Sequence, residues 1–81
     1  MINNEQVEQH LRGLSDVNYV KVSGDGYHYQ LTMVSDVFQG KSKVARHQWV
    51  YTQLKDYIIS GKLHALTMQT WTQAEWEKNH G

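Results

Sequence analysis

The sequence predicts a two-layer α+β domain with the element order α-β-β-α-α-β-α. Residues 27–34 alternate apolar and polar side chains, which is typical of a strand with one buried face. Between Ser42 and Gly61, apolar residues recur at spacings of three and four, which indicates an amphipathic helix. Helix-capping residues also occur near both ends of the chain. We therefore expect a three-stranded mixed sheet with helices on one face.

Two capping boxes mark the first and last helices. They are formed by Asn3 with Gln6 and by Thr72 with Glu75. The first predicts a short helix over residues 3–14 and the second a helix over residues 73–79. Trp71 and Trp76 flank the second box at the positions of a hydrophobic staple, so we expect their rings to meet.

A β-hairpin follows the first helix. Residues 17–22 are rich in β-branched and aromatic side chains and indicate one strand. The segment Ser23-Gly24-Asp25-Gly26 predicts a turn, and residues 27–34 return as the second strand. His28 falls on the polar face of that strand, where a solvated histidine is the simplest interpretation.

The longest predicted helix is capped by Ser42 and ends at Gly61, after a short helical turn between Ser35 and Gly40. Its predicted apolar stripe consists of Val44, His47, Tyr51, Leu54 and Ile58, widened by Trp49, Val50 and Tyr57. Residues 63–70 indicate the third strand, and in this interpretation His64 opens its apolar face.

Composition excludes several classes of protein. The chain has 81 residues, no cysteine and a net charge of zero. This length predicts one domain over residues 1–81, and without cysteine the chain supplies neither disulfides nor thiolate ligands. Zero net charge gives no general attraction to nucleic acid. No stretch resembles a signal peptide or approaches the roughly 20 apolar residues of a membrane span, so we expect a cytoplasmic protein.

Motifs for autonomous catalysis are missing. Gly40-Lys41-Ser42 resembles the end of a phosphate-binding loop, but Ser35 stands where that loop needs its upstream glycine. We interpret the tripeptide as a turn followed by a helix cap. The sequence has no nucleophile elbow and no useful carboxylate pair, so we expect no enzyme activity.

Histidine is the remaining side chain with suitable chemistry. His47 lies in the apolar stripe, and we interpret it as a packed, hydrogen-bonded core residue. His64 stands at the mouth of a strand, where one ring nitrogen can face a partner and the other a backbone carbonyl. It is therefore either a metal ligand or an ordinary surface histidine.

Four segments together resemble the BolA family, and within it the small bacterial, IbaG-type branch. They are Val34 to Ser42 (VSDVFQGKS), Arg46 to Tyr51 (RHQWVY), Leu63 to Leu66 (LHAL) and Thr72 to Trp76 (TQAEW). The resemblance extends over nearly the whole chain and implies a class II KH-like fold. The chain departs from many relatives in the loop Ser23–Gly26, which is short and holds neither cysteine nor histidine.

The resemblance also implies a partner and a cofactor. Family members pair with monothiol glutaredoxins and share a [2Fe-2S] iron–sulfur cluster, for which the partner and glutathione supply thiolates. His64 matches the family's C-terminal histidine and is the implied cluster ligand, and His28 is the nearest candidate for a second one. The expected function is an adaptor that holds, transfers or senses a cluster and is a monomer or weak homodimer when alone.

The alternative is a DNA-binding transcriptional regulator, which the family resemblance also suggests. Lys41, Lys43 and Arg46 form a basic cluster at a helix N-terminus, where they could contact phosphate. The same cluster could receive an acidic or glutathione-bearing face of a glutaredoxin, or simply keep a turn solvated. A third hypothesis is a response to acid through the five histidines, which charge near pH 6.

Overall fold

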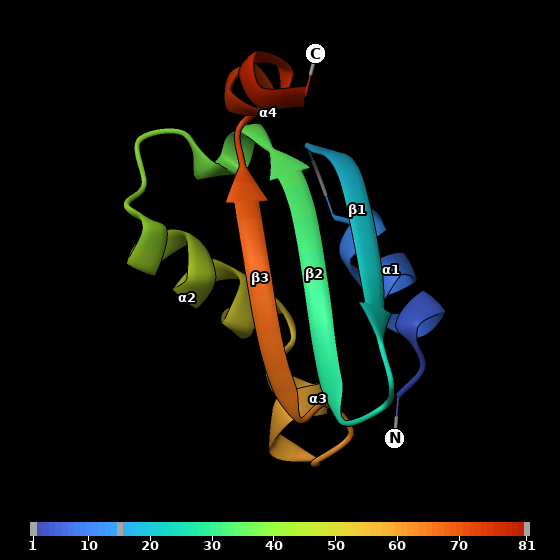
Figure 1. Ribbon diagram of the computed structural model, residues 1–81. Coiled ribbons are helices and arrows are strands. Elements are labelled where there is room, and N and C mark those ends of the chain that lie inside the picture. The colour runs from blue at the N-terminus through green and yellow to red at the C-terminus, as the bar shows by residue number, and fades with distance from the viewer. Residues whose placement is uncertain (1, 15, 81) are drawn as a thin grey trace.

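A three-stranded sheet forms the centre of the molecule, with helices packed around it (Figure 1). The computed structural model describes residues 2–14 and 16–80, leaving out the side chain of His80. Within these residues the strands are β1 (Val17–Gly24), β2 (His28–Ser35) and β3 (Ala65–Trp71). The helices are α1 (Asn4–Arg12), the 3-10 turn η1 (Asp36–Phe38), α2 (Lys43–Gln53), α3 (Lys55–Ile59) and α4 (Gln73–His80). The predicted α+β class is confirmed.

The sheet is mixed and has the strand order β1-β2-β3. β1 is antiparallel to β2, whereas β2 and β3 are parallel, with His28 opposite Ala65 and Val34 opposite Trp71. Because parallel strands begin at the same end of a sheet, the chain returns to that end through η1, α2 and α3. β1 and β3 are both edge strands.

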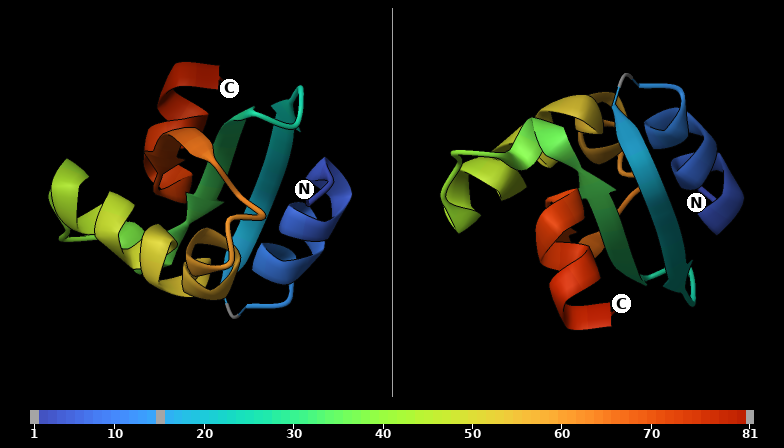
Figure 2. Two further views of the ribbon diagram at one scale, coloured as in Figure 1. Left: turned by 90° about the horizontal axis from the view of Figure 1, so that it is seen from below. Right: turned by 90° about the horizontal axis from the view of Figure 1, so that it is seen from above.

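One face of the sheet carries the main core. Its buried side chains come from all three strands and from the helices on that face: Val7, Leu11, Val20, Val22, Tyr29, Leu31, Met33, Phe38, Val50, Leu54, Leu63 and Met68. The Tyr29 hydroxyl donates a hydrogen bond to the backbone carbonyl of Ile2, which ties the N-terminal segment to the middle strand. Figure 2 shows α1 and α3 on this side of the sheet and α4 on the other.

The last helix covers the end of the opposite face. Trp76 of α4 stacks on Tyr19 of β1, with ring centroids 5.3 Å apart. Tyr19 alternates with the buried Val20, so it belongs to the face opposite the main core. The predicted placement of helices on one face therefore holds for α1, α2 and α3, and α4 is the exception. Val34 of β2 is fully buried on this second face, which gives α4 an apolar surface to cover.

The predicted single helix from Ser42 to Gly61 is wrong in one respect, because the structure interrupts it at Leu54. Leu54 has φ −103° and ψ 11°, which separates α2 from α3. The interruption leaves the carbonyl of Gln53 available, and His10 Nε2 donates a hydrogen bond to it at 2.8 Å. Helix α1 thus supplies the partner that the interrupted helix lacks. Residue spacing within one helix could not reveal this contact.

The buried stripe of α2 is also rotated relative to the prediction. Val50 and Leu54 are completely buried, whereas Val44 and Tyr51 are 66% and 43% exposed. Helical spacing allowed either arrangement, since apolar residues occupy both sides of the predicted stripe. The position of the sheet decides which side is buried.

Both predicted capping boxes are confirmed. Asn3 and Gln6 exchange side-chain-to-backbone hydrogen bonds at the start of α1, and Thr72 and Glu75 do the same before α4. Trp71 meets Trp76 edge-on with ring centroids 6.1 Å apart, as the staple predicts. None of the helices in the described part of the chain has the length and apolarity needed to cross a bilayer.

Candidate functional sites

The β1–β2 turn is held by one aspartate. The Asp25 carboxylate accepts hydrogen bonds from the backbone N–H groups of Tyr27 and His28, both at 2.9 Å. These bonds, first that of His28 and then that of Tyr27, lower the pKa of the Asp25 carboxyl. The turn is shorter than predicted, because β1 continues to Gly24 and β2 begins at His28.

His64 lies beside this turn, one residue before β3. Its predicted place within the strand, at the start of the apolar face, is wrong, because the ladder begins at Ala65, whose N–H donates to the carbonyl of Tyr27. The preceding Leu63 N–H is used in closing the end of α3, where it donates to the carbonyl of Tyr57. His64 therefore occupies the short connection between a helix end and a strand start. Its ring is exposed and lies 6.1 Å from the ring of Tyr27, centroid to centroid.

His64 and His28 share one end of the sheet but come from different positions in the ladder. His28 is exposed and opens β2, opposite Ala65 rather than opposite His64. Neither ring forms a hydrogen bond with another described residue, so the backbone carbonyl expected behind His64 is not found. His10, by contrast, is bonded to Gln53. The described residues contain no group of three or more His, Cys, Asp or Glu side chains that could hold a metal ion.

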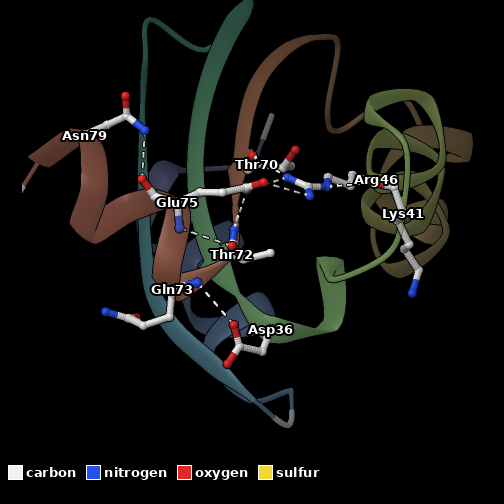
Figure 3. Close-up of polar contacts among 8 residues, drawn as sticks. All are labelled: Asp36, Lys41, Arg46, Thr70, Thr72, Gln73, Glu75 and Asn79. Atoms are coloured by element: carbon white, nitrogen blue, oxygen red, sulfur yellow. Dashed lines mark hydrogen bonds and ion pairs between the residues drawn. The ribbon is translucent and has the colours of Figure 1, made fainter.

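Arg46 occupies the opposite end of the sheet and joins four segments (Figure 3). Its Nη1 and Nη2 atoms donate to the two carboxylate oxygens of Glu75, at 2.7 and 3.2 Å. Its Nε donates to the carbonyl of Lys41 at 3.0 Å, and Nη1 also reaches the carbonyl of Thr70 at 3.3 Å. The Arg46 side chain is only 14% exposed. The Arg46 donors therefore bond to groups within the protein, whereas the sequence predicted a surface on which they could contact phosphate.

The two lysines of the predicted basic cluster differ from each other. Lys41 Nζ donates to the backbone carbonyl of Val37 at 2.8 Å and is partly buried. Lys43, the first residue of α2, is exposed and forms no hydrogen bond or ion pair with another described residue. The three cations lie close together as predicted. Lys43 differs from the other two because its ammonium group is exposed and has no hydrogen-bond or ion-pair partner among the described residues.

The pairing of Glu75 with Arg46 is the contact at this end that the sequence did not predict. The hydrogen bond that Glu75 accepts from the N–H of Thr72 belongs to the predicted capping box. The Arg46 hydrogen bond and then the Thr72 N–H lower the pKa of Glu75 to about 2. The capping-box spacing located Glu75 at a helix start, but the contact with Arg46 depends on tertiary packing.

A groove of about 430 Å³ lies between the first half of α2 and the last half of β3. It is lined by Lys41, Lys43, Arg46, His47, Gln69, Thr70, Trp71 and Glu75. His47 is packed here as predicted, but its buried Nε2 has no hydrogen-bond partner among the described residues, so the prediction of a hydrogen-bonded residue is wrong for that atom. Burial and, secondly, the charge of Lys43 lower the pKa of the His47 imidazole.

The fold and its two ends define a small BolA-like domain, and comparison with known proteins agrees. The family model described as BolA-like protein matches residues 3–75. The chain belongs to the BolA family. Among named relatives it is 36% identical to the acid stress protein IbaG of Escherichia coli K12, over 94% of this chain and 90% of that protein. It is 39% identical to an uncharacterized protein of Acinetobacter guillouiae from the rpoN-murA intergenic region, over 95% of this chain and 93% of that protein.

Solved structures show the same fold. A bolA protein homologue from Coxiella burnetii is 31% identical, with a TM-score of 0.82 over 95% of this chain and 99% of that one. The BolA domain of SufE1 from Arabidopsis thaliana is 35% identical, with a TM-score of 0.76 over 88% of this chain and 92% of that one. BolA-type domains therefore occur both as short chains and as parts of larger proteins.

Proposed function

We propose that this protein is a non-enzymatic adaptor that pairs with a monothiol glutaredoxin and contributes His64 to a shared [2Fe-2S] iron–sulfur cluster. Membership of the BolA family supports the class of function. The observation that carries the proposal is the state of the His64 ring, which is exposed and forms no hydrogen bond with any described residue.

The geometry of the hairpin end supports this role for His64. A neutral imidazole can bind a metal only through a ring nitrogen that is accessible and not already used. His10 is hydrogen-bonded, and Nε2 of His47 is buried, so neither is suited. His64 and His28 are the two suitable histidines whose side chains are described. The Asp25-held turn keeps the backbone beside them in a defined position.

The chain can provide only part of a cluster site. A [2Fe-2S] cluster takes four protein or small-molecule ligands, and imidazole can replace thiolate at some of them, which raises the reduction potential. The chain has no cysteine, and no three potential ligands meet in its described part. The remaining ligands would therefore come from the glutaredoxin and its glutathione. His28 would be a second ligand from this chain if the partner draws both rings to one iron.

Reconstitution with a monothiol glutaredoxin, glutathione, iron and sulfide tests the proposal, with visible circular dichroism as the readout. We expect a spectrum that differs from that of the glutaredoxin alone and that reverts to it with His64→Ala. His28→Ala tests the second ligand, and Tyr51→Ala, which removes an exposed ring from α2, is the control. An unchanged spectrum on adding the wild-type protein would refute cluster sharing.

The basic cluster of Lys41, Lys43 and Arg46 supports the DNA-binding alternative less well than the exposed His64 supports the adaptor. Arg46 and Lys41 donate their charged groups to acceptors within the protein. Arg46 is paired with the Glu75 carboxylate, whereas Lys41 bonds only to a neutral carbonyl, so Lys41 and Lys43 would each release a counterion on binding phosphate. This corresponds to a shallow slope of about −1.8 in a plot of log affinity against log salt. A slope several times steeper in a DNA titration would instead favour the regulator.

A further inference from the structure

The direction of the main-chain groups of β3 shows which of them face away from the sheet. The N–H of Ala65 bonds to Tyr27 in the chain segment leading into β2, whereas the carbonyl of Thr70 bonds to Arg46 on the other side. The N–H and C=O groups of one residue in a strand point the same way, and those of the next residue point the opposite way. The main-chain groups of Leu66, Met68 and Thr70 therefore face the outer edge.

The two edges of the sheet differ in how many of their outward main-chain groups are hydrogen-bonded to side chains. At the β1 edge, Glu8 accepts a hydrogen bond from the N–H of Val22 at 2.8 Å, and Arg12 donates to the carbonyl of Val20 at 3.2 Å. These two α1 side chains, which also pair with each other, occupy groups that another strand would need. At the β3 edge, Arg46 donates a hydrogen bond to the carbonyl of Thr70. No described side chain forms a hydrogen bond with the outward main-chain groups of Leu66 or Met68.

The groove beside this edge carries a net positive charge, which suits the binding of an acidic peptide segment. It runs between β3 and α2, and Lys41, Lys43 and Arg46 lie along its α2 side. Arg46 is neutralised by Glu75, which leaves an excess of positive charge from the two lysines. Figure 1 shows α2 diverging from β3 toward its own N-terminus, where Lys43 is the first residue of the helix.

We propose that the outer edge of β3 binds an extended, acidic segment of a partner protein as a fourth strand. The segment would pair with the outward main-chain groups of Leu66 and Met68, while its carboxylates lie near Lys43 and Lys41. Strand addition of this kind derives affinity from main-chain hydrogen bonds and selectivity from side chains. A second copy of this chain is a poorer occupant, because it would bring its own lysines to the same groove. This proposal does not depend on cluster binding.

A titration of the ¹⁵N-labelled full chain with acetyl-Val-Glu-Val-Glu-Val-Glu-Val-Glu-amide tests this assignment. We expect the largest amide shifts at Leu66, Met68 and Thr70. A fully N-methylated peptide of the same sequence keeps the charges but has no backbone N–H, and we expect it to bind at least about tenfold more weakly. Lys43→Glu should weaken binding about two- to fivefold, while Lys21→Glu, an exposed lysine on β1, is the matched control.

Three outcomes would overturn the proposal. Equal binding of the N-methylated peptide would mean simple charge attraction, and shifts confined to other elements would place the contact elsewhere. Shifts of the β3 amides that depend on protein concentration without peptide would assign the edge to a second copy. The same titration with His64→Ala separates this proposal from the cluster function, because strand addition should survive that substitution.

Discussion

At the scale of single residues, the Arg46–Glu75 pair is the contact that most clearly links sequence-distant segments. It joins α2 to the start of α4 through two hydrogen bonds between charged groups. We predict that Glu75→Gln, which keeps a capping-box residue, lowers the free energy of unfolding by about 1 kcal/mol at pH 7. For a domain of this size, that corresponds to a fall of about 4–8 °C in Tm.

The same pair predicts a dependence on pH. Because the pKa of Glu75 falls from 4.5 to about 2 on folding, its stabilising effect is complete above about pH 4.5 and is lost as the pH falls toward 2. The difference between wild type and Glu75→Gln in urea unfolding should therefore shrink between pH 5 and pH 2.5. A constant difference would mean that packing of the side chain, rather than its charge, is responsible.

His47 also makes stability fall at low pH, but here folding favours the neutral form of the side chain. Burial lowers the pKa of its imidazole below 6.5, so stability present above about pH 6.5 is lost as the pH falls from there through the lower pKa of the folded state. Replacing His47 by Leu should reduce this loss and remove a buried nitrogen that lacks a partner in the described part of the chain. Urea unfolding of both proteins at pH 7 and pH 5.5 measures the change, and an identical pH response would contradict the prediction.

At the scale of elements, the β1–β2 turn depends on Gly24. Gly24 has φ +150°, and a Cβ there would lie 2.2 Å from the carbonyl oxygen of His28. We predict that Gly24→Ala costs more than about 2 kcal/mol of stability and shifts the amide signals of Tyr27 and His28. Gly40→Ala is the control, because Gly40 also has positive φ but open space around its Cα, so its cost should be about 1 kcal/mol. Equal costs at the two sites would show that crowding at Gly24 is relieved.

The elements that could be predicted from sequence are those with local signals. Capping boxes at Asn3 and Thr72 and the alternation after Tyr27 are local, and the corresponding elements form as predicted. The break at Leu54 and the exposure of Val44 and Tyr51 were not predicted. They depend on where α1 and the sheet lie, and helical spacing carries no information on either.

At the scale of the whole molecule, the two candidate sites lie at opposite ends of β3. His64 precedes its first residue, Ala65, and Arg46 contacts Thr70 near its last residue, Trp71. Seven residues of strand separate them by roughly 20 Å. We predict that His64→Ala and Lys43→Glu act additively on glutaredoxin affinity, within about 0.5 kcal/mol in calorimetric titrations. A larger interaction energy would show that one partner surface spans both ends.

The two candidate sites differ in how much of each could be predicted from the sequence. Sequence reasoning found His64 through its position near the start of a strand and through a family resemblance, whereas its neighbour Tyr27 is brought close only by the parallel pairing of β2 with β3. It grouped Lys41, Lys43 and Arg46 correctly by position, but Arg46 is held by Glu75 from a segment far along the chain. The charges can be counted from the sequence, but which of them a ligand can reach cannot be predicted from it.

The parallel pairing of β2 with β3 has a consequence for the order of folding. Residues of the β1–β2 hairpin are near neighbours in the sequence, so the hairpin can form before the rest, whereas β3 must first close a loop that contains α2 and α3. We therefore expect His64 and the outer edge of β3 to reach their final surroundings after the hairpin has formed. Nascent or partly unfolded chains would display the hairpin without either candidate site, and partner binding would select chains whose folding is complete.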